Sequence, residues 1–303
     1  MRTHTLQSVL ALAMSLNLGI GTAASPAIGT VLTSGAFRLD NATVRGNATL
    51  FEGSVLETAV APSSVQLNSG ARVSLAAESR GRLFGDRLVL EKGATNLDNS
   101  TGFRLVALGL TVQPDRGSST GSVVFEGPNR VRVSAVSGSL RVLNISGQLV
   151  ANLPQGAALA FEPQQGPSNV SRVSGCLEAK SGHYTLTDEV TNVTVEVAGD
   201  GVEKEAGNKV EVNGVTDPTA TPAGGASQLV RAREIRRVAK GCGGKAVAVA
   251  AAAGTGGAVG AAAGTGIGIT TVAIVGGVAA AAAIGGLAAT GSQKDAAPAA
   301  SRR

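Results

Sequence analysis

The sequence predicts an all-β fold of two β-domains, the first a β-roll or sandwich and the second a small barrel, with an Ala/Gly-rich helical segment at the C-terminal end. Three observations lead to this prediction. Up to about residue 240, short apolar stretches alternate with polar residues at a period of two and end at Gly, Asn or Asp. No window there keeps a helical period of 3.6. From 246 to 292 the chain becomes an uncharged run of mostly Ala, Gly and Val.

The first predicted domain covers residues 29–165. Its alternating stretches include Ala71–Leu75, Arg87–Leu90 and Val131–Ser134. The pattern Leu-x-x-Gly-Ala, followed by alternating apolar residues, occurs at 67–75 and 153–161, and its first half recurs at 90–94. Glycine tolerates a positive φ, so each copy predicts a tight turn and then a strand with one buried face. Repeated units of this kind predict a β-roll or a sandwich of similar hairpins.

Three stretches of this domain share a rhythm of Gly and Val with a known family: 46–58, 64–73 and 142–156. They resemble the FecR-type periplasmic β-domain, and the resemblance covers about residues 29–165. It implies a β-domain outside the cytoplasm, in a family that relays a signal from an outer-membrane receptor to a sigma factor. Members of that family carry a cytoplasmic segment and a membrane helix ahead of the domain, where this chain has a signal-like N-terminus.

A linker is predicted at 166–171, because the overlapping stretch 163–168 contains two prolines and a glycine between patterned segments. The second domain, 172–242, again alternates, notably at 193–197 and 206–214, and we expect a final strand at 228–239. It resembles small exported OB-like β-domains of unassigned function. That resemblance implies a short Greek-key barrel.

The first 24 residues have the layout of a secretory signal peptide. A short polar start with Arg2 and His4 precedes the apolar run Val9–Ile20, and small residues at 22–24 provide a cleavage site. An uncleaved anchor is the alternative, although the run is short for a bilayer. We therefore expect an exported protein of the periplasm or cell envelope.

Export decides how the two cysteines are interpreted. Cys176 and Cys242 bracket the second domain, and in an oxidising compartment two thiols tend to pair. We predict a disulfide between them, with two free buried thiols as the alternative.

The uncharged segment 246–292 predicts a transmembrane helix or a helical hairpin, with a charged tail at 293–303. Residues 267–289 are long enough to cross a bilayer as one helix. Recurrent Gly-x-x-x-Gly spacing would allow helices to pack closely and copies of the chain to self-associate. A disordered Ala/Gly tail is the alternative.

Six basic residues cluster between Arg231 and Lys245, at the end of the second domain and just ahead of this segment. They predict contact with anionic lipid headgroups, or else a solvated strand face. The cluster comprises Arg231, Arg233, Arg236, Arg237, Lys240 and Lys245.

Catalytic chemistry has little support in the sequence. His183 is the only histidine beyond the signal peptide, so a Ser/His triad would have to use it. No phosphate loop occurs, and we expect no cofactor and no metal. The acidic pairs Asp86/Glu91 and Asp188/Glu189 have no aromatic surroundings that suit sugar hydrolysis. The basic stretch has no aromatic residues for stacking, which argues against nucleic acid.

The sequence therefore favours a non-enzymatic structural or interaction protein that binds an unknown envelope protein or polymer and is tethered through its C-terminal membrane segment. A FecR-like envelope sensor is the alternative. An enzyme acting on cell-wall or glycan polymers is the third possibility.

Overall fold

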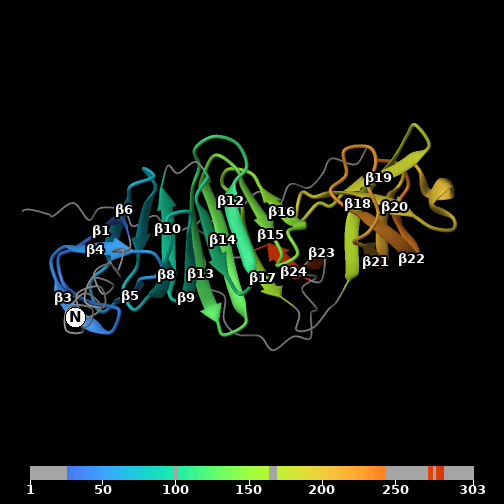
Figure 1. The fold of residues 1–303 in the computed structure, drawn as a ribbon. Coiled ribbons are helices and arrows are strands. Elements are labelled where there is room, and N and C mark those ends of the chain that lie inside the picture. Colours follow the sequence, from blue (N-terminus) through green and yellow to red (C-terminus); the bar gives the residue numbers. More distant parts are fainter. Residues whose placement is uncertain (1–25, 99–101, 164–168, 243–271, 276–277, 283–303) are drawn as a thin grey trace, which may run out of the picture.

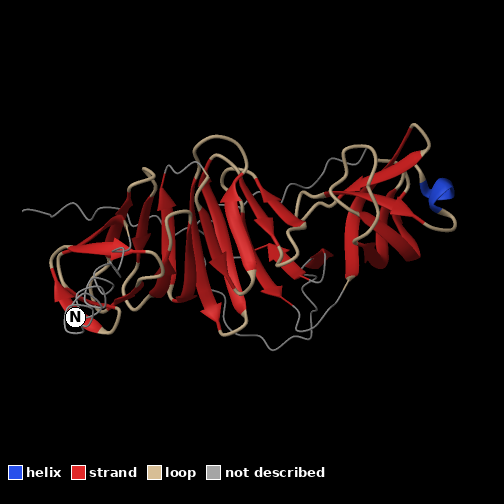
Figure 2. Cartoon of the chain, in the orientation of Figure 1, coloured by secondary structure: helices blue, strands red, loops and turns tan. Residues whose placement is uncertain are grey.

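The computed structural model describes residues 26–98, 102–163, 169–242, 272–275 and 278–282, shown in colour in Figure 1. Nearly all of the regular structure is β, which confirms the predicted class (Figure 2). The one helical element among the described residues is a short 3-10 helix, η1 (Val202–Glu205). The predicted signal peptide, the charged tail 293–303 and Lys245 lie outside the described residues.

Residues 27–163 form an elongated ladder of two sheets, and the chain crosses between the sheets as it advances along the ladder (Figure 1). One sheet has nine strands, in the order β16 (Leu149–Leu153), β15 (Leu140–Leu143), β12 (Leu110–Pro114), β11 (Arg104–Ala107), β9 (Arg87–Lys92), β8 (Arg80–Leu83), β5 (Val55–Thr58), β2 (Ala36–Leu39) and β3 (Ala42–Arg45). The other belongs to a 15-stranded sheet, and its ladder strands are β17 (Ala158–Pro163), β14 (Arg130–Ser137), β13 (Thr120–Gly127), β10 (Ala94–Asp98), β7 (Arg72–Leu75), β6 (Ser63–Leu67), β1 (Ala27–Thr33) and β4 (Ala48–Phe51).

The core lies between the two sheets and is aliphatic. Strict alternation sends every second side chain inward, as in β9, where Leu88 and Leu90 are buried between outward-facing neighbours. Phe37 and Phe161 are the only aromatic residues among the largest fully buried side chains of the described chain. Each buried Leu or Val contributes roughly 1.5–3 kcal/mol. The ladder is therefore held together along its whole length.

The turns predicted from the repeated Leu-x-x-Gly-Ala pattern are present. Gly70, Gly93 and Gly156 have φ angles of +88°, +85° and +80°. Each precedes a strand, namely β7, β10 and β17. Gly93 and Gly156 mark corners at which the chain passes from the nine-stranded sheet into the 15-stranded sheet, whereas Gly70 lies in the β6–β7 hairpin within the 15-stranded sheet.

Residues 170–239 form a separate five-stranded unit, β18 (Val170–Lys180), β19 (His183–Thr187), β20 (Thr194–Ala198), β21 (Lys209–Asp217) and β22 (Leu229–Ala239). The order β19-β20-β22-β21-β18 closes on itself, because β18 also pairs with β19. The pair β20–β22 is parallel and the others are antiparallel. The strand expected at 228–239 is confirmed as β22.

A hairpin from far along the chain joins the two units. Strand β24 (Val278–Ala282) pairs with β17, and β23 (Val272–Val275) pairs with β18 at Arg172↔Ile274. These two stretches of the predicted helical segment 246–292 are thus strands. Their β-branched residues favour strands, and β17 offers an edge for pairing. The rest of that segment lies outside the described residues.

At the nine-stranded sheet the two units also touch. The backbone N–H of Asn152, on the edge strand β16, donates to the carbonyl of Thr191, at 2.7 Å, in the β19–β20 loop. Within the described part of the chain, no helix is both long and apolar enough to span a membrane.

Candidate interaction site

The outer face of the nine-stranded sheet carries a concentration of arginine that the sequence analysis did not single out. The alternation that buries Leu and Val inside the ladder places charged residues outside, as in β8, where Arg80 and Arg82 flank the buried Gly81. Seven strand arginines face outward on this sheet: Arg38, Arg45, Arg80, Arg82, Arg87, Arg104 and Arg141. We call this surface the arginine face.

Carboxylates on the arginine face lie between arginines. Arg38 and Arg80 approach Glu57 on the strand between them, at 3.9 and 3.6 Å. Arg80 Nε also donates to Glu91 Oε2 at 2.8 Å, and Arg82 lies 3.9 Å from the same carboxylate. The side chains are about 35–53% exposed, so each pair contributes little to stability by itself.

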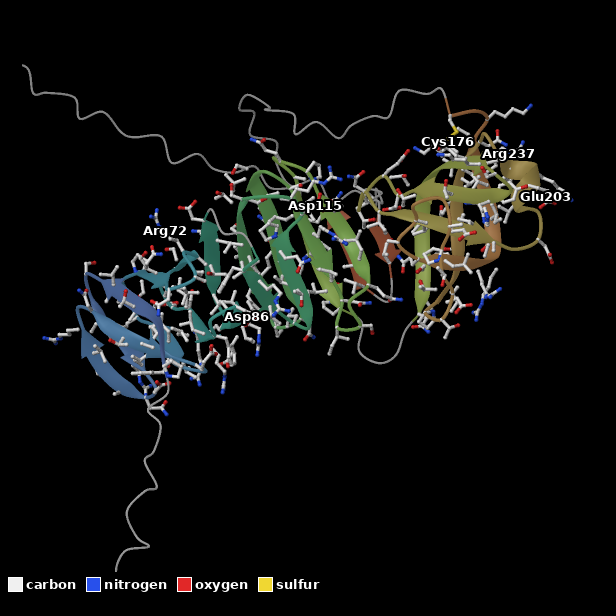
Figure 3. The ribbon with its side chains drawn as sticks, turned by 45° about the horizontal axis from the view of Figure 1, so that its top comes forward. Arg72, Asp86, Asp115, Cys176, Glu203 and Arg237 are labelled. Atoms are coloured by element: carbon white, nitrogen blue, oxygen red, sulfur yellow. A yellow bond between two sulfur atoms is a disulfide. The ribbon has the colours of Figure 1, made fainter. Side chains whose placement is uncertain are left out.

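A second cluster is centred on Asp86, in the turn before β9 (Figure 3). Asp86 pairs with Arg87 at 3.0 Å and with Arg104 in a short contact. Arg87 and Arg104 are direct neighbours in the parallel β9–β11 ladder. Burial tends to raise the pKa of Asp86, but the hydrogen bond and charge of Arg104 and the charge of Arg87 outweigh it, and the pKa is lowered.

A third cluster joins Asp115, which follows β12, to Arg141 at 3.8 Å and to the exposed Arg116 at 3.9 Å. Arg45 has no ion pair with any residue that the structure describes. The arginine face therefore holds more guanidinium groups than carboxylates.

On the opposite face of the ladder, the positive and negative charges of the strands are equal in number. Its outward strand charges are three arginines and three carboxylates: Arg72, Arg130, Arg132, Asp98, Glu126 and Glu162. Here too two arginines share one carboxylate, because Arg130 pairs with Glu126 at 3.1 Å and Arg132 makes a short contact with it.

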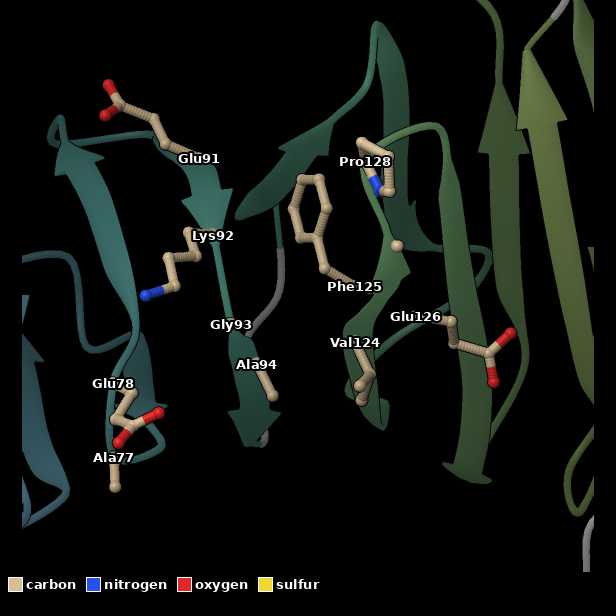
Figure 4. Close-up of a pocket in the computed structure, with 11 residues that line it drawn as sticks. Ala77, Glu78, Glu91, Lys92, Gly93, Ala94, Val124, Phe125, Glu126 and Pro128 are labelled. Atoms are coloured by element: carbon tan, nitrogen blue, oxygen red, sulfur yellow. The ribbon is translucent and has the colours of Figure 1, made fainter.

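An open groove of about 620 Å³ lies at the side of the ladder, beside the β9–β10 corner (Figure 4). Phe125 and Pro128 form an apolar wall on one side, and Glu78 and Lys92 lie on the other. Glu91, which forms an acidic pair with Asp86 in the sequence, also lines this groove. Asp86 and Glu91 each pair with arginines of the arginine face, in different clusters.

The five described members of the predicted basic cluster lie on β22 and just beyond it, and carboxylates pair with three of them. Arg231 pairs with Asp217 at 2.8 Å, Arg237 with Glu205 at 2.6 Å, and Arg236 makes a short contact with Glu211. Arg233 and Lys240 are exposed and make no ion pair within the described chain. The hydrogen bonds from Thr219 and Arg231 lower the pKa of Asp217 to about 2.

Cys176, on β18, and Cys242, just after β22, form a disulfide with a Cα–Cα distance of 5.6 Å (Figure 3). It ties the end of the last barrel strand to the first. The signal that pointed to this pair was that the two cysteines of the chain bracket the second domain and that export was expected.

The remaining residues considered for catalysis, His183, Asp188 and Glu189, make hydrogen bonds or ion pairs within the barrel unit. His183 Nδ1 lies 2.8 Å from Glu196 Oε1, and Glu196 Oε2 accepts the backbone N–H of Ala223. The carboxylate of Asp188 is buried and accepts hydrogen bonds within its own loop and from β18. The neighbouring Glu189 pairs with Lys209 at 2.7 Å.

No cluster of three or more potential metal ligands occurs among the residues that the structure describes. Comparisons of the chain with models of protein families, with curated proteins and with solved structures found no match.

Proposed function

We propose that this chain is an exported, non-enzymatic interaction protein of the cell envelope, with its β-domains displayed outside the cytoplasm. The observation that carries the proposal is the arginine face. It is a broad charged surface on a sheet whose strands are fixed by backbone hydrogen bonds, and it is offered to solvent along the ladder. Such a surface suits the binding of a large partner.

Two further features support an extracytoplasmic location. A disulfide persists in oxidising compartments, and Cys176–Cys242 closes the barrel unit. The N-terminal 24 residues have the layout of a secretory signal. A membrane tether is supported by the uncharged composition of 246–292, and after the strand assignment of β23 and β24 it would have to use other residues of that segment.

The alternative is a FecR-like component that senses an envelope signal. It is favoured by the extent of the resemblance, 29–165, which coincides with the two-sheet ladder, 27–163. The closed five-strand order of β18–β22, with a helical turn after its third strand, likewise supports the OB-like assignment. A sensing role would additionally need a contact with a cytoplasmic effector.

The test is fractionation of the native host, with alkaline carbonate extraction and mass analysis of the mature N-terminus. We expect a mature chain that begins near Ser25, carries an intact disulfide and is recovered with the envelope. A chain that keeps residues 1–24 and is recovered in the cytoplasm with reduced cysteines would overturn the proposal. Retention of the chain in the membrane pellet after carbonate extraction would support the membrane tether, and its release would overturn that part of the proposal.

A further inference from the structure

Arginine recurs across the nine-stranded sheet rather than gathering at one point. It faces outward on β3, β2, β8, β9, β11 and β15, which are six of the nine strands. The first and last of these are seven strand spacings apart, or about 34 Å at the usual spacing of about 4.8 Å. A linear molecule that crosses the strands would therefore meet one arginine after another.

Each cluster has one arginine in excess, which in the third cluster is Arg116 of the turn after β12 rather than a strand arginine of this face. Three arginines share Glu57 and Glu91, two share Asp86, and two share Asp115. A guanidinium group has five N–H donors, and one carboxylate uses at most two of them at a time. Donors therefore remain for a further anion beside each internal carboxylate.

The arginines of this face already contact protein carboxylates, which shows that their guanidinium groups can be reached and paired by a carboxylate. The surroundings are not purely charged. Val89 and Val106 are direct neighbours across β9 and β11, half-buried on the same face as Arg87 and Arg104. An apolar strip beside arginines suits the C–H face of a sugar ring that carries a carboxylate, and it offers nothing to a bare phosphate chain.

We propose that the arginine face binds an acidic polysaccharide, a linear sugar polymer with repeated carboxylates, laid across the strands of the nine-stranded sheet. This inference rests on the proposed envelope function and names its partner class. Charge complementarity favours this face over the opposite one, where arginines and carboxylates are equal in number.

The first test measures binding of fluorescently labelled alginate oligomers to the full mature chain by anisotropy at several salt concentrations. Arg87→Gln with Arg104→Gln should weaken binding roughly 10-fold and lower the slope of log Kd against log salt by roughly 2. The matched control is Arg130→Gln with Arg132→Gln, which also removes two arginines that share one carboxylate, but on the opposite face. It should leave binding unchanged. Equal losses in the two double variants, or no loss in either, would overturn the proposal.

A second variant tests the same face without removing an arginine. Asp86→Asn releases Arg87 and Arg104 from their internal partner, so alginate binding should tighten severalfold, whereas Glu126→Gln on the opposite face should have no effect. Weaker binding in Asp86→Asn, in a variant with unchanged thermal unfolding, would contradict recognition by the arginines.

Polyphosphate and neutral dextran serve as comparison probes. Polyphosphate binding without alginate binding would overturn the assignment to a carboxylate polymer, and equal binding of dextran would overturn a role for charge. The outcomes of these binding experiments can be distinguished from those of the fractionation experiment. If the protein is found in the envelope but does not bind alginate, only this inference is overturned. If it is found in the cytoplasm but binds alginate through the arginine face, only the proposed location is overturned.

Discussion

At the scale of single residues, buried polar groups fix the loops of the barrel unit. The carboxylate of Asp188 is 1% exposed and accepts hydrogen bonds from the backbone N–H groups of Ser174 at 2.8 Å and Thr191 at 2.9 Å, and from the Thr191 hydroxyl at 2.9 Å. Burial raises its pKa, although these bonds act in the opposite direction. The same loop presents the Thr191 carbonyl to the ladder, so Asp188 supports the contact between the two units.

Asp188→Ala should lower the free energy of unfolding by about 2–3 kcal/mol, because it leaves buried N–H donors without acceptors. Denaturant unfolding followed by circular dichroism measures the change. The neighbouring Glu189→Ala is the control, since its exposed pair with Lys209 should contribute less than about 1 kcal/mol. Similar losses in both variants would show that the hydrogen bonds of Asp188 are not the cause.

The lowered pKa of Asp217 predicts how the stability of the fold depends on pH. Its pKa in the folded chain is about 2, below the ordinary value of 3.8, because Thr219 and Arg231 donate hydrogen bonds to the charged form. A lowered pKa stabilises the fold above the ordinary value, and this contribution should disappear as the pH falls from about 4 to 2. An NMR titration of the side chain should show the low midpoint, and Arg231→Gln should move it upward. A midpoint near 3.8 in the unaltered chain would contradict the contact.

At the scale of elements, the corners of the ladder depend on glycine. Gly93 has a φ of +85°, and a Cβ at this position would lie 2.6 Å from the Cα of Ser79. The hydroxyl of Ser79 accepts the backbone N–H of Ala94 at 2.9 Å, immediately after this turn. The corner therefore needs both the left-handed backbone and the missing side chain.

Gly93→Ala should destabilise the chain by about 2 kcal/mol or more, because strain and a steric clash add up. Gly109→Ala is the control, since it has a similar φ of +75° with nothing within 4 Å, and it should cost only about 1 kcal/mol. Thermal unfolding of both variants measures the difference. Equal effects would mean that the close approach to Ser79 is relieved by a small shift.

The strands themselves could be predicted from the sequence, because alternation decides which side chains are buried. The ion pairs could not. Arg80 reaches Glu91 through a register shift between Arg80 and Gly81, and no local pattern shows that irregularity. The arginine face could not be predicted either. Its arginines are scattered between Arg38 and Arg141 in the sequence, and only the strand order of the folded sheet brings them onto one surface.

At the scale of the whole molecule, the disulfide and the C-terminal hairpin join distant parts of the chain. The disulfide between Cys176 and Cys242 was predicted because the two cysteines bracket the second domain and an oxidising compartment was expected. The strands β23 and β24 were not expected, because a run of Ala, Gly and Val is compatible with helix or strand. The open edge of β17, with which β24 pairs, favours a strand over a helix, and that edge exists only in the folded ladder.

Loss of the disulfide should act on one unit more than on the other. The bond spans 66 residues, and the chain-entropy model gives a contribution of about 4 kcal/mol to the unit that it closes. Cys176→Ser with Cys242→Ser should raise amide hydrogen exchange in β18–β22 far more than in β5–β14. A uniform rise along the chain would instead indicate that the two units unfold together.

The direction of the strands has a mechanical consequence. In the ladder they run across the long axis of the molecule, so the hydrogen bonds between neighbouring strands point along it (Figure 1). A pull on the two ends would load these bonds one row at a time, as in a zipper, and the ladder would extend strand by strand. The barrel unit would resist longer, because its disulfide carries the load directly from Cys176 to Cys242, past residues 177–241. A protein held at one end and bound to a polymer along its side would thus yield gradually without losing its whole binding surface at once.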